Sequence, residues 1–266
     1  MTDRFGRKIT YLRISVTDRC NLRCRYCMPA EGVKLLPAED IFSFEEIVEV
    51  TRIAVDMGVM KVRLTGGEPL VRRDIVDLVR ALAGIEGIND LAMTTNGTLL
   101  AQHARALAAA GLQRVNISLD STDPQRYCEL TRGGNIQHVL DGLDAAQAAG
   151  LHPIKLNCVV SDSDCAGDAE SVKEFGRSRG LEVRMIRQMN FQAGRFSLIE
   201  GSSGGNCPRC NRLRLTSNGQ IRPCLFSDMQ FGVRKLGALG ALRQAVAAKP
   251  QAGGPCTHNW MFGIGG

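Results

Sequence analysis

Short β-rich runs alternate six times with amphipathic helical runs between residues 11 and 188, which limits the chain to a few folds. Repeated strand–helix alternation predicts parallel strands joined by crossover helices. Six units fall short of the eight that close a (β/α)8 barrel. We therefore expect the α/β class, in the form of a partial (β/α)6 barrel with its chemistry at the carboxyl ends of the strands. The expected strands are Tyr11–Val16, Met60–Leu64, Asp90–Thr94, Arg114–Ser118, Pro153–Val160 and Glu182–Arg187.

The expected helices lie between these strands. The first begins at Ser43-Phe-Glu-Glu46, where a serine followed three residues later by glutamate is typical of a capping box. The others cover about 72–84, 98–110, 136–149 and 166–179. Several of them end near a glycine, as helices often do.

The pattern changes after residue 189, and this divides the chain into three parts. Residues 1–189 form the predicted partial barrel, and 190–206 are a connector rich in glycine and serine. Residues 207–266 form a small C-terminal extension that carries a predicted hairpin, with its turn at Asn218-Gly219, and a Gly265-Gly266 tail.

Composition narrows the class of protein. The chain has 266 residues, 44% of them hydrophobic and 23% charged, as in an ordinary globular protein. Neither a membrane span nor the apolar stretch of a signal peptide occurs, so we expect a cytoplasmic protein without a membrane partner. The formal net charge of +6 suits an anionic small molecule. Aromatic residues make up only 5%, and no basic run is interleaved with them, which argues against a nucleic-acid partner.

Ten cysteines in an expected reducing compartment indicate metal binding rather than disulfides. Cys20, Cys24 and Cys27 form a C-x3-C-x2-C pattern. Three thiolates can hold three irons of a [4Fe–4S] cluster, whose usual complement is four cysteines. The fourth iron would then be open to a chelating ligand such as S-adenosylmethionine (SAM). The alternative is a chance cluster, or a zinc site completed by a distant histidine.

A second set, Cys207, Cys210 and Cys224, again offers three thiolates, whereas a zinc ribbon needs two C-x2-C pairs. Arg212 and Arg214 follow two residues apart, so on a strand they face the same side. Two guanidinium groups beside a metal suit the capture of phosphate. The alternative is a solvated basic strand face.

Other polar residues stand at strand ends. Thr65-Gly66-Gly67-Glu68-Pro69 places paired glycines, which allow close backbone approach, beside a glutamate that can accept an ammonium group. Thr94 and Ser118 place hydroxyl groups at the ends of the next two strands, where simple turn chemistry is the alternative. Lys155 and Arg184 lie on apolar strands, where an unpaired charge is costly to bury, so a bound anion is the better explanation for them.

These motifs together resemble a known family. The segments Tyr11–Pro29, Lys61–Asp74, Cys207–Thr216 and Arg222–Ser227 are similar to the GTP 3′,8-cyclase (MoaA) family of radical SAM enzymes, which acts in molybdenum cofactor biosynthesis. The resemblance covers residues 8–189 nearly continuously and resumes at 207–228. It implies a GTP cyclase of the lyase type with SAM and two [4Fe–4S] clusters, in which the open iron of the second cluster meets the purine.

The resemblance also implies roles for individual residues, with no catalytic side chain beyond the cluster and SAM. The metal ligands would be Cys20, Cys24, Cys27, Cys207, Cys210 and Cys224, and the SAM contacts Tyr26, Gly66, Gly67, Glu68, Ser118 and Met189. The GTP contacts would be Arg13, Arg63, Thr94, Lys155, Arg184, Arg212 and Arg214, and Gly265 and Gly266 would assist from the tail. The implied partners are an electron donor such as flavodoxin, a downstream cyclic pyranopterin synthase and a second copy in a homodimer.

Two features depart from the family pattern. Only 17 residues separate Met189 from Cys207, fewer than we expect in this family. The missing stretch would normally help to form the wall of the substrate chamber. Cys256 or the nearby His258 could give the second cluster a fourth ligand, although an incidental thiol is the better interpretation of Cys256. Cys128, Cys158 and Cys165 are expected to be small buried hydrophobic residues.

Three functions therefore remain open from the sequence. The first is GTP cyclisation, and the second is a related radical SAM reaction on another nucleotide or a peptide. The short connector and Cys256 favour the second, and the retained arginines favour the first. The third is an iron–sulfur electron carrier or sensor without turnover, which would have no use for the Gly-Gly-Glu-Pro segment.

Overall fold

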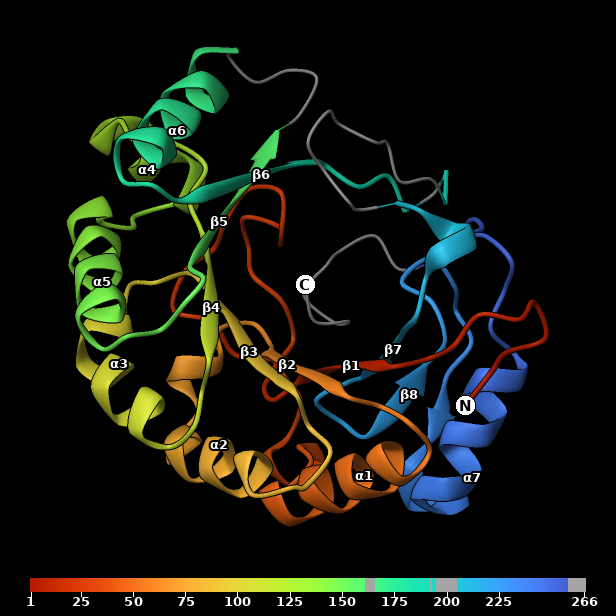
Figure 1. Ribbon diagram of the computed structural model, residues 1–266. Coiled ribbons are helices and arrows are strands. Elements are labelled where there is room, and N and C mark those ends of the chain that lie inside the picture. The colour runs from red at the N-terminus through yellow and green to blue at the C-terminus, as the bar shows by residue number, and fades with distance from the viewer. Residues whose placement is uncertain (161–165, 192, 195–204, 258–266) are drawn as a thin grey trace.

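The chain was analysed as a computed structural model, which describes residues 1–160, 166–191, 193–194 and 205–257. The strands curve around the middle of the molecule and helices cover the outside (Figure 1). This arrangement confirms the predicted partial barrel. The connector falls largely outside the described residues, and so do Cys165, His258, Gly265 and Gly266.

The described strands form a nine-stranded sheet in the order β6-β5-β4-β3-β2-β1-β7-β8-β9, and β1 to β6 are parallel, as predicted. The predicted bounds of the fourth and sixth strands coincide with the observed ones, and the others differ by one or two residues. The barrel strands are β1 (Tyr11–Ser15), β2 (Lys61–Thr65), β3 (Asp90–Thr95), β4 (Arg114–Ser118), β5 (Lys155–Val160) and β6 (Glu182–Arg187).

The five predicted helices are α1, α2, α3, α5 and α6, and the structure adds α4 and α7, which the sequence analysis missed. Their bounds are α1 (Phe44–Asp56), α2 (Ile75–Ala83), α3 (Leu100–Ala109), α4 (Pro124–Thr131), α5 (Ile136–Ala148), α6 (Ala166–Ser178) and α7 (Val233–Ala247). Short 3-10 turns occur at Ala38–Asp40, Pro69–Val71 and Cys207–Arg209. At the start of α1, the Ser43 hydroxyl accepts a hydrogen bond from the Glu46 amide. The Glu46 carboxylate in turn accepts one from the Ser43 amide, which confirms the capping box.

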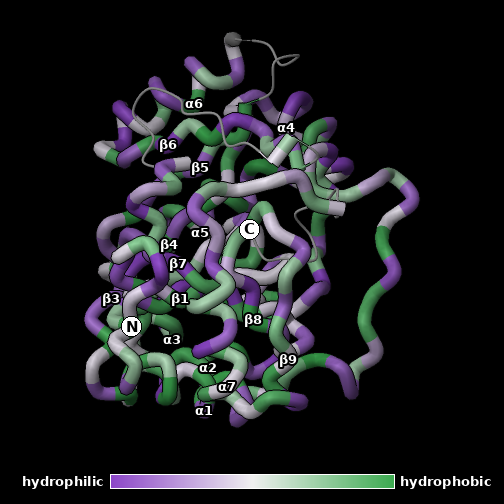
Figure 2. Tube along the Cα trace, turned by 90° about the vertical axis from the view of Figure 1, so that its right-hand side faces the viewer, coloured by the Kyte–Doolittle hydropathy of each residue, from purple (hydrophilic) through white to green (hydrophobic). Residues whose placement is uncertain are grey.

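The C-terminal extension continues the sheet of the barrel. Its first strand, β7 (Arg212–Leu215), runs parallel to β1, and β8 (Gln220–Arg222) and β9 (Phe231–Gly232) follow antiparallel. The predicted turn is confirmed at Gly219, whose positive φ of 75° favours glycine and where an added Cβ would lie 2.3 Å from the Phe42 ring. Helix α7 lies beside α1 in both views (Figures 1 and 2).

Side chains along each strand point alternately outward, into the hydrophobic core, and inward, into the centre of the barrel. On β1, Leu12 and Ile14 are fully buried against the outer helices, while Tyr11 and Arg13 line the central cavity. No helix in the described part of the chain is long and apolar enough to cross a bilayer.

Candidate functional site

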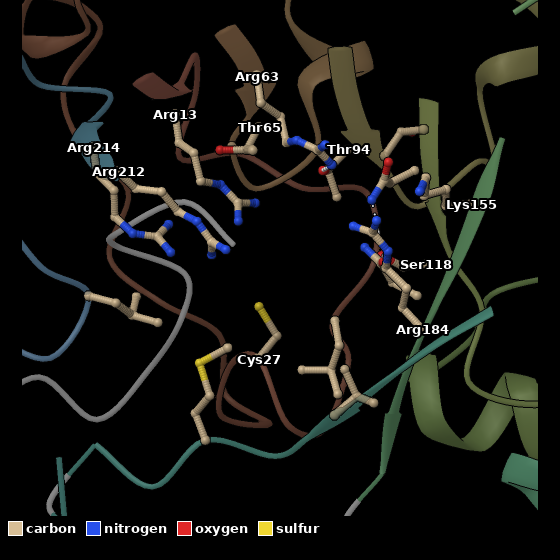
Figure 3. A pocket seen from close by; sticks show the side chains of 18 of the residues that line it. Arg13, Cys27, Arg63, Thr65, Thr94, Ser118, Lys155, Arg184, Arg212 and Arg214 are labelled. Atoms are coloured by element: carbon tan, nitrogen blue, oxygen red, sulfur yellow. Dashed lines mark hydrogen bonds between the residues drawn. The ribbon is translucent and has the colours of Figure 1, made fainter. Parts of the chain in front are cut away.

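A large cavity of about 1240 Å³ occupies the centre of the barrel. Every sequence-predicted site residue that the structure describes lines it: all six proposed cysteine ligands, all six SAM residues and all seven GTP residues. In Figure 3 the guanidinium groups of Arg13, Arg63, Arg212 and Arg214 point into the cavity from one side, and Cys27 faces the same space from another. The structure thus brings together residues that lie far apart in the sequence.

The Gly-Gly-Glu-Pro segment packs directly on the first cysteine loop. The amide of Gly67 donates to the Thr17 carbonyl at 2.9 Å, and the amide of Glu68 donates to the Arg19 carbonyl at 2.8 Å. A Cβ on Gly67 would lie 2.3 Å from the Arg19 carbonyl oxygen and 3.1 Å from the Cys20 Cβ. Only glycine allows this approach, and the segment and the loop together form a closely packed unit, which we call the cradle.

The first three cysteines lie close enough to influence one another. Burial raises the pKa of Cys24, and the neighbouring charges of Asp120, Cys27 and Cys20 raise it further. Burial, with the charge of Cys20, raises the pKa of Cys27 to about 12. Thiolates at this site need a positive partner, and iron provides one. Three thiol groups that line one cavity supply the donor set for three irons of a [4Fe–4S] cluster.

Glu68, which belongs to this segment, is buried, and most of its acceptor capacity is already in use. Its Oε1 accepts from the Leu70 amide (3.0 Å) and the Thr95 hydroxyl (2.7 Å), and its Oε2 accepts from the Asn96 amide (2.6 Å). A carboxylate accepts about four hydrogen bonds, which leaves one place for an ammonium donor. Burial raises the pKa of Glu68 to about 7, against these hydrogen bonds, which lower it.

The other predicted SAM residues surround the same space. Tyr26 forms a side-chain hydrogen bond with Asp120, and burial raises its pKa. Ser118 ends β4. Met189 is half-buried and packs against a small cluster of Phe191, Leu225, Phe226 and Cys256.

The arginines of the site form a row across neighbouring strands. Arg63, Arg13 and Arg214 are register partners on β2, β1 and β7, which stand about 4.8 Å apart in a sheet. Like charges opposite one another destabilise a sheet. Burial lowers the pKa of Arg214 to about 10, and the adjacent Arg212 lowers it too. The fold thus concentrates positive charge at a point where a polyanion would relieve it.

Tyr11 lies in the next row, between Lys61 and Arg212. The guanidinium carbons of Arg63 and Arg212 lie 6.0 and 5.7 Å from the centre of its ring. Burial raises the pKa of Tyr11, but the charges of Arg13, Arg63 and the other nearby arginines outweigh burial and lower it overall. The phenol thus separates and partly screens the cations.

Lys155 and Arg184 occupy the opposite wall, and one expectation about them was wrong. Neither charge is unpaired: the Lys155 ammonium pairs with Oε2 of Glu182, and Arg184 Nε lies 2.7 Å from its Oε1. Glu182 starts β6 beside Lys155, a cross-strand pair that single-strand patterns do not reveal. Two cations share one carboxylate, so this wall still carries net positive charge. Thr94, between the two walls, accepts from Arg63 at 3.3 Å.

The second cysteine set lies at the start and end of the β7–β8 hairpin. Cys207 begins the 3-10 turn before β7, Cys210 directly follows that turn, and Cys224 follows β8. Burial raises the pKa of Cys224, whereas for Cys210 the effect of burial is outweighed by hydrogen bonds and by the charges of Lys249 and Arg212, which lower its pKa. Three thiol groups beside a buried cation and an arginine fit an anionic iron–sulfur cluster.

The remaining cysteines divide into two kinds. Cys158 is fully buried, as predicted, but Cys128 is exposed, so its prediction was wrong. Cys128 lies on α4, a helix that the sequence analysis missed. Cys256 is buried, and its thiol donates to the Phe191 carbonyl at 3.3 Å.

The cavity residues that the sequence analysis did not assign to a site include Tyr11, Asn157 and Lys249. Tyr11 and Asn157 occupy alternate, inward-facing strand positions, so strand periodicity could have found them. Asn116 is 2% exposed and its Oδ1 has no hydrogen-bond partner among the described residues, although its Nδ2 approaches Asn157 at 3.4 Å. Lys249 gave no sequence signal, because it follows a helix whose pattern is broken by glycines.

Comparison with known proteins agrees with this geometry. Residues 14–175 match the radical SAM superfamily. The fold is similar to that of SuiB from Streptococcus suis, in its complex with the precursor peptide SuiA, with a TM-score of 0.67 at 16% identity. That match covers 92% of this chain and 66% of SuiB. Similarly, anSMEcpe with bound AdoMet gives a TM-score of 0.63 at 14% identity, over 91% of this chain and 81% of that one. The partial barrel and the three-cysteine loop are thus those of a radical SAM protein, which uses SAM and a [4Fe–4S] cluster.

Curated relatives define the family more narrowly. The GTP 3′,8-cyclase of Pelotomaculum thermopropionicum is 41% identical, over 94% of this chain and 94% of the relative. The GTP 3′,8-cyclase of Moorella thermoacetica is 40% identical, over 99% of this chain and 96% of the relative. The chain belongs to the GTP 3′,8-cyclase family. The alignment with the Pelotomaculum relative spans 307 positions, so it contains gaps in this chain of 266 residues.

Proposed function

We propose that this chain converts GTP into (8S)-3′,8-cyclo-7,8-dihydroguanosine 5′-triphosphate, the first step of molybdenum cofactor biosynthesis. The observation that carries the proposal is the row of Arg63, Arg13 and Arg214 in the cavity that both cysteine sets also line. A triphosphate relieves the repulsion of this row, and guanidinium groups bind phosphate oxygens in pairs. The relatives named above carry the same activity in their names.

SAM is proposed to bind against the cradle of the first cysteine loop. The backbone of Gly66 and Gly67 and the carboxylate of Glu68 would receive its amino group, and Tyr26, Ser118 and Met189 would surround the rest. When bound to the first cluster, SAM supplies the radical chemistry. The chain's own residues hold SAM and GTP in one cavity that is open enough for both.

GTP is proposed to lie between the two walls of the cavity. Arg13, Arg63, Arg212 and Arg214 would hold it on one side, and Lys155 and Arg184 on the other, with Thr94 between them. Both walls carry net positive charge, which suits the four negative charges of a nucleoside triphosphate. The second cysteine set would hold a cluster with one iron open to the purine.

Glu68 makes SAM affinity depend on pH. With a pKa of about 7, the carboxylate is largely protonated at pH 6 and ionised at pH 8. The ammonium of SAM favours the ionised form, so we expect SAM to bind roughly tenfold more tightly at pH 8 than at pH 6. In the absence of SAM, the pH dependence of folding stability has the opposite sign. Because burial raises the pKa of Glu68, the contribution of Glu68 to stability is fully present below the usual pKa of glutamate and is lost as the pH rises through 7. Equilibrium dialysis of anaerobically reconstituted protein measures the affinity, and an equal slope in Glu68→Gln would contradict the assignment.

The iron content tests whether Cys256 belongs to the second cluster. Because its thiol donates to a backbone carbonyl, we expect Cys256→Ser to keep about eight irons per chain, as two cubes require. Cys224→Ser is the matched control and should lose iron. A fall in Cys256→Ser to the level of the control would show that Cys256 is a ligand.

The alternative is a related reaction on another nucleotide or on a peptide. The short connector, with 17 residues between Met189 and Cys207, is the observation in its favour. The solved structures above share only the fold, at 14–16% identity, so the peptide named with SuiB carries no weight here. A non-catalytic electron carrier would not need the charged walls of the cavity.

We also propose an electron donor such as flavodoxin, a downstream cyclic pyranopterin synthase and a homodimer, as in the family.

The decisive experiment is anaerobic turnover. Both clusters are reconstituted, SAM, dithionite and GTP are added, and 5′-deoxyadenosine is quantified beside the 3′,8-cyclised nucleotide. We expect both products with GTP, and ATP as the control nucleotide should give no cyclised product. Deoxyadenosine without a cyclised nucleotide would overturn the GTP assignment and leave the radical chemistry standing.

A further inference from the structure

Lys249 is among the most deeply buried side chains of the protein, at 1% exposure, although it ends in an ammonium group. Lys249 follows α7, and its backbone amide donates to the carbonyl of Val246 in the last turn of that helix (3.2 Å). Burying an ammonium group costs several kcal/mol unless it is hydrogen-bonded and balanced by negative charge. The surroundings of Lys249 therefore indicate what it is for.

All three donors of the ammonium group are used. Nζ donates to the carbonyls of Arg212 (2.7 Å) and Pro223 (2.6 Å), and it forms a third hydrogen bond with the Cys210 thiol. Arg212 comes two residues after Cys210, and Pro223 comes directly before Cys224. The ammonium thus joins the two ends of the hairpin that carry the second cysteine set.

A buried ammonium group at this place depends on the same cysteines for negative charge. Burial lowers the pKa of Lys249, and the charges of Cys210 and Cys224 act against burial, while Arg7 lowers the pKa further. Neutral thiols would leave a buried cation without a counter-ion. Thiolates that hold a cluster would balance it.

A second buried cation, Arg7, braces the same region without touching a thiol group. Arg7 donates to the carbonyls of Cys207 (2.8 Å), Pro250 (2.6 Å) and Gln251 (3.0 Å). Its charge is already paired with Asp3 at 2.6 Å. Arg7 therefore shares the bracing role of Lys249 but not its place beside the sulfur atoms, which makes it a matched control.

We infer that Lys249 is the built-in counter-charge of the second cluster, a positioning residue that stabilises the reduced, more negative cluster through its hydrogen bond to Cys210. This inference rests on the second cluster proposed above. Hydrogen bonds to the sulfur atoms and local charge are among the factors that set the reduction potential of such clusters. Removal of the cation should therefore lower the potential, whereas loss of bracing alone should leave it unchanged.

The test isolates the second cluster in full-length protein that carries Cys20→Ser, Cys24→Ser and Cys27→Ser. In this background, iron content and the potential from an EPR-monitored titration are compared for the parent, Lys249→Met, Lys249→Arg and Arg7→Met. We expect Lys249→Met to disfavour reduction at least tenfold, which is about 59 mV for one electron. Lys249→Arg should bring the potential most of the way back to that of the parent. Arg7→Met should lower thermal stability without changing the potential.

The outcomes separate this inference from the proposed function. An unchanged potential in Lys249→Met, or an equal shift in Arg7→Met, overturns the role of Lys249 and leaves the second cluster intact. If Lys249→Met binds no iron, Lys249→Arg decides: recovery of iron and potential upholds the inference, and failure overturns it. A parent background without iron would disprove the second cluster itself, and the inference with it.

Discussion

Replacement of Gly67 by alanine is expected to abolish SAM cleavage and halve the iron content. The added Cβ would lie 2.3 Å from the Arg19 carbonyl oxygen, 2.6 Å from its carbonyl carbon and 3.1 Å from the Cys20 Cβ. These atoms belong to the loop that carries the first cysteine set, and backbone cannot move aside as a flexible side chain can. Overpacking of this kind costs about 1–3 kcal/mol, and displacement of a reacting group by about 1 Å can cost ~100-fold in rate.

Iron analysis and the yield of 5′-deoxyadenosine measure this effect. We expect iron to fall from about eight to about four per chain, because the second cysteine set is untouched. Gly167→Ala is the matched control: Gly167 lies in α6, where an added Cβ would meet no described atom within 4 Å, so alanine should be neutral or slightly stabilising there. Full iron and normal SAM cleavage in Gly67→Ala would show that the cradle is not needed.

Replacement of Arg214 by methionine is expected to weaken GTP binding without destabilising the ligand-free protein. Methionine keeps much of the apolar stem but removes a charge from the row of Arg63, Arg13 and Arg214. A charge-assisted hydrogen bond contributes about 1.5–3 kcal/mol, which corresponds to roughly a 10- to 150-fold loss of affinity. Because burial and Arg212 lower the pKa of Arg214, loss of its charge relieves strain in the folded state.

The opposite signs of these two effects make the test specific. Calorimetry with GTP and thermal melting of the ligand-free protein give the two values. The control is Arg234→Met, since Arg234 pairs with Glu46 at 2.8 Å and neither residue lines the cavity. That variant should lose a little stability and no GTP affinity. A drop in stability of Arg214→Met with unchanged affinity would mean that the arginine row is structural.

Most of the barrel was predictable because its signals are local. Strand alternation, the Ser43 capping box and the Asn218-Gly219 turn each depend on a few neighbouring residues, and all three are confirmed. Helix α7 was missed because Gly237 interrupts it with a φ of 69°, which breaks the periodic pattern. Helix α4 is only eight residues long and largely polar, although Asp123 and Pro124 mark its start.

The site was predictable as a set of residues but not as an arrangement. The sequence showed that Arg212 and Arg214 share a strand face, but only the register of β7 against β1 and β2 places Arg214 in one row with Arg13 and Arg63. The pairing of Lys155 with Glu182 likewise depends on the register of β5 and β6. Such cross-strand relations are set by the tertiary fold, so a single sequence does not reveal them.

Formation of a bond between the 3′ carbon and C8 of GTP requires that the 3′ carbon lose its hydrogen atom, so the most direct test of the central claim follows that atom. GTP labelled with deuterium at the 3′ carbon is incubated anaerobically with the reconstituted protein, SAM and dithionite, and 5′-deoxyadenosine is analysed by mass spectrometry. If the cavity holds SAM and GTP as proposed, deuterium appears in 5′-deoxyadenosine in step with the cyclised nucleotide. Unlabelled 5′-deoxyadenosine, with the deuterium still on the nucleotide, would contradict it.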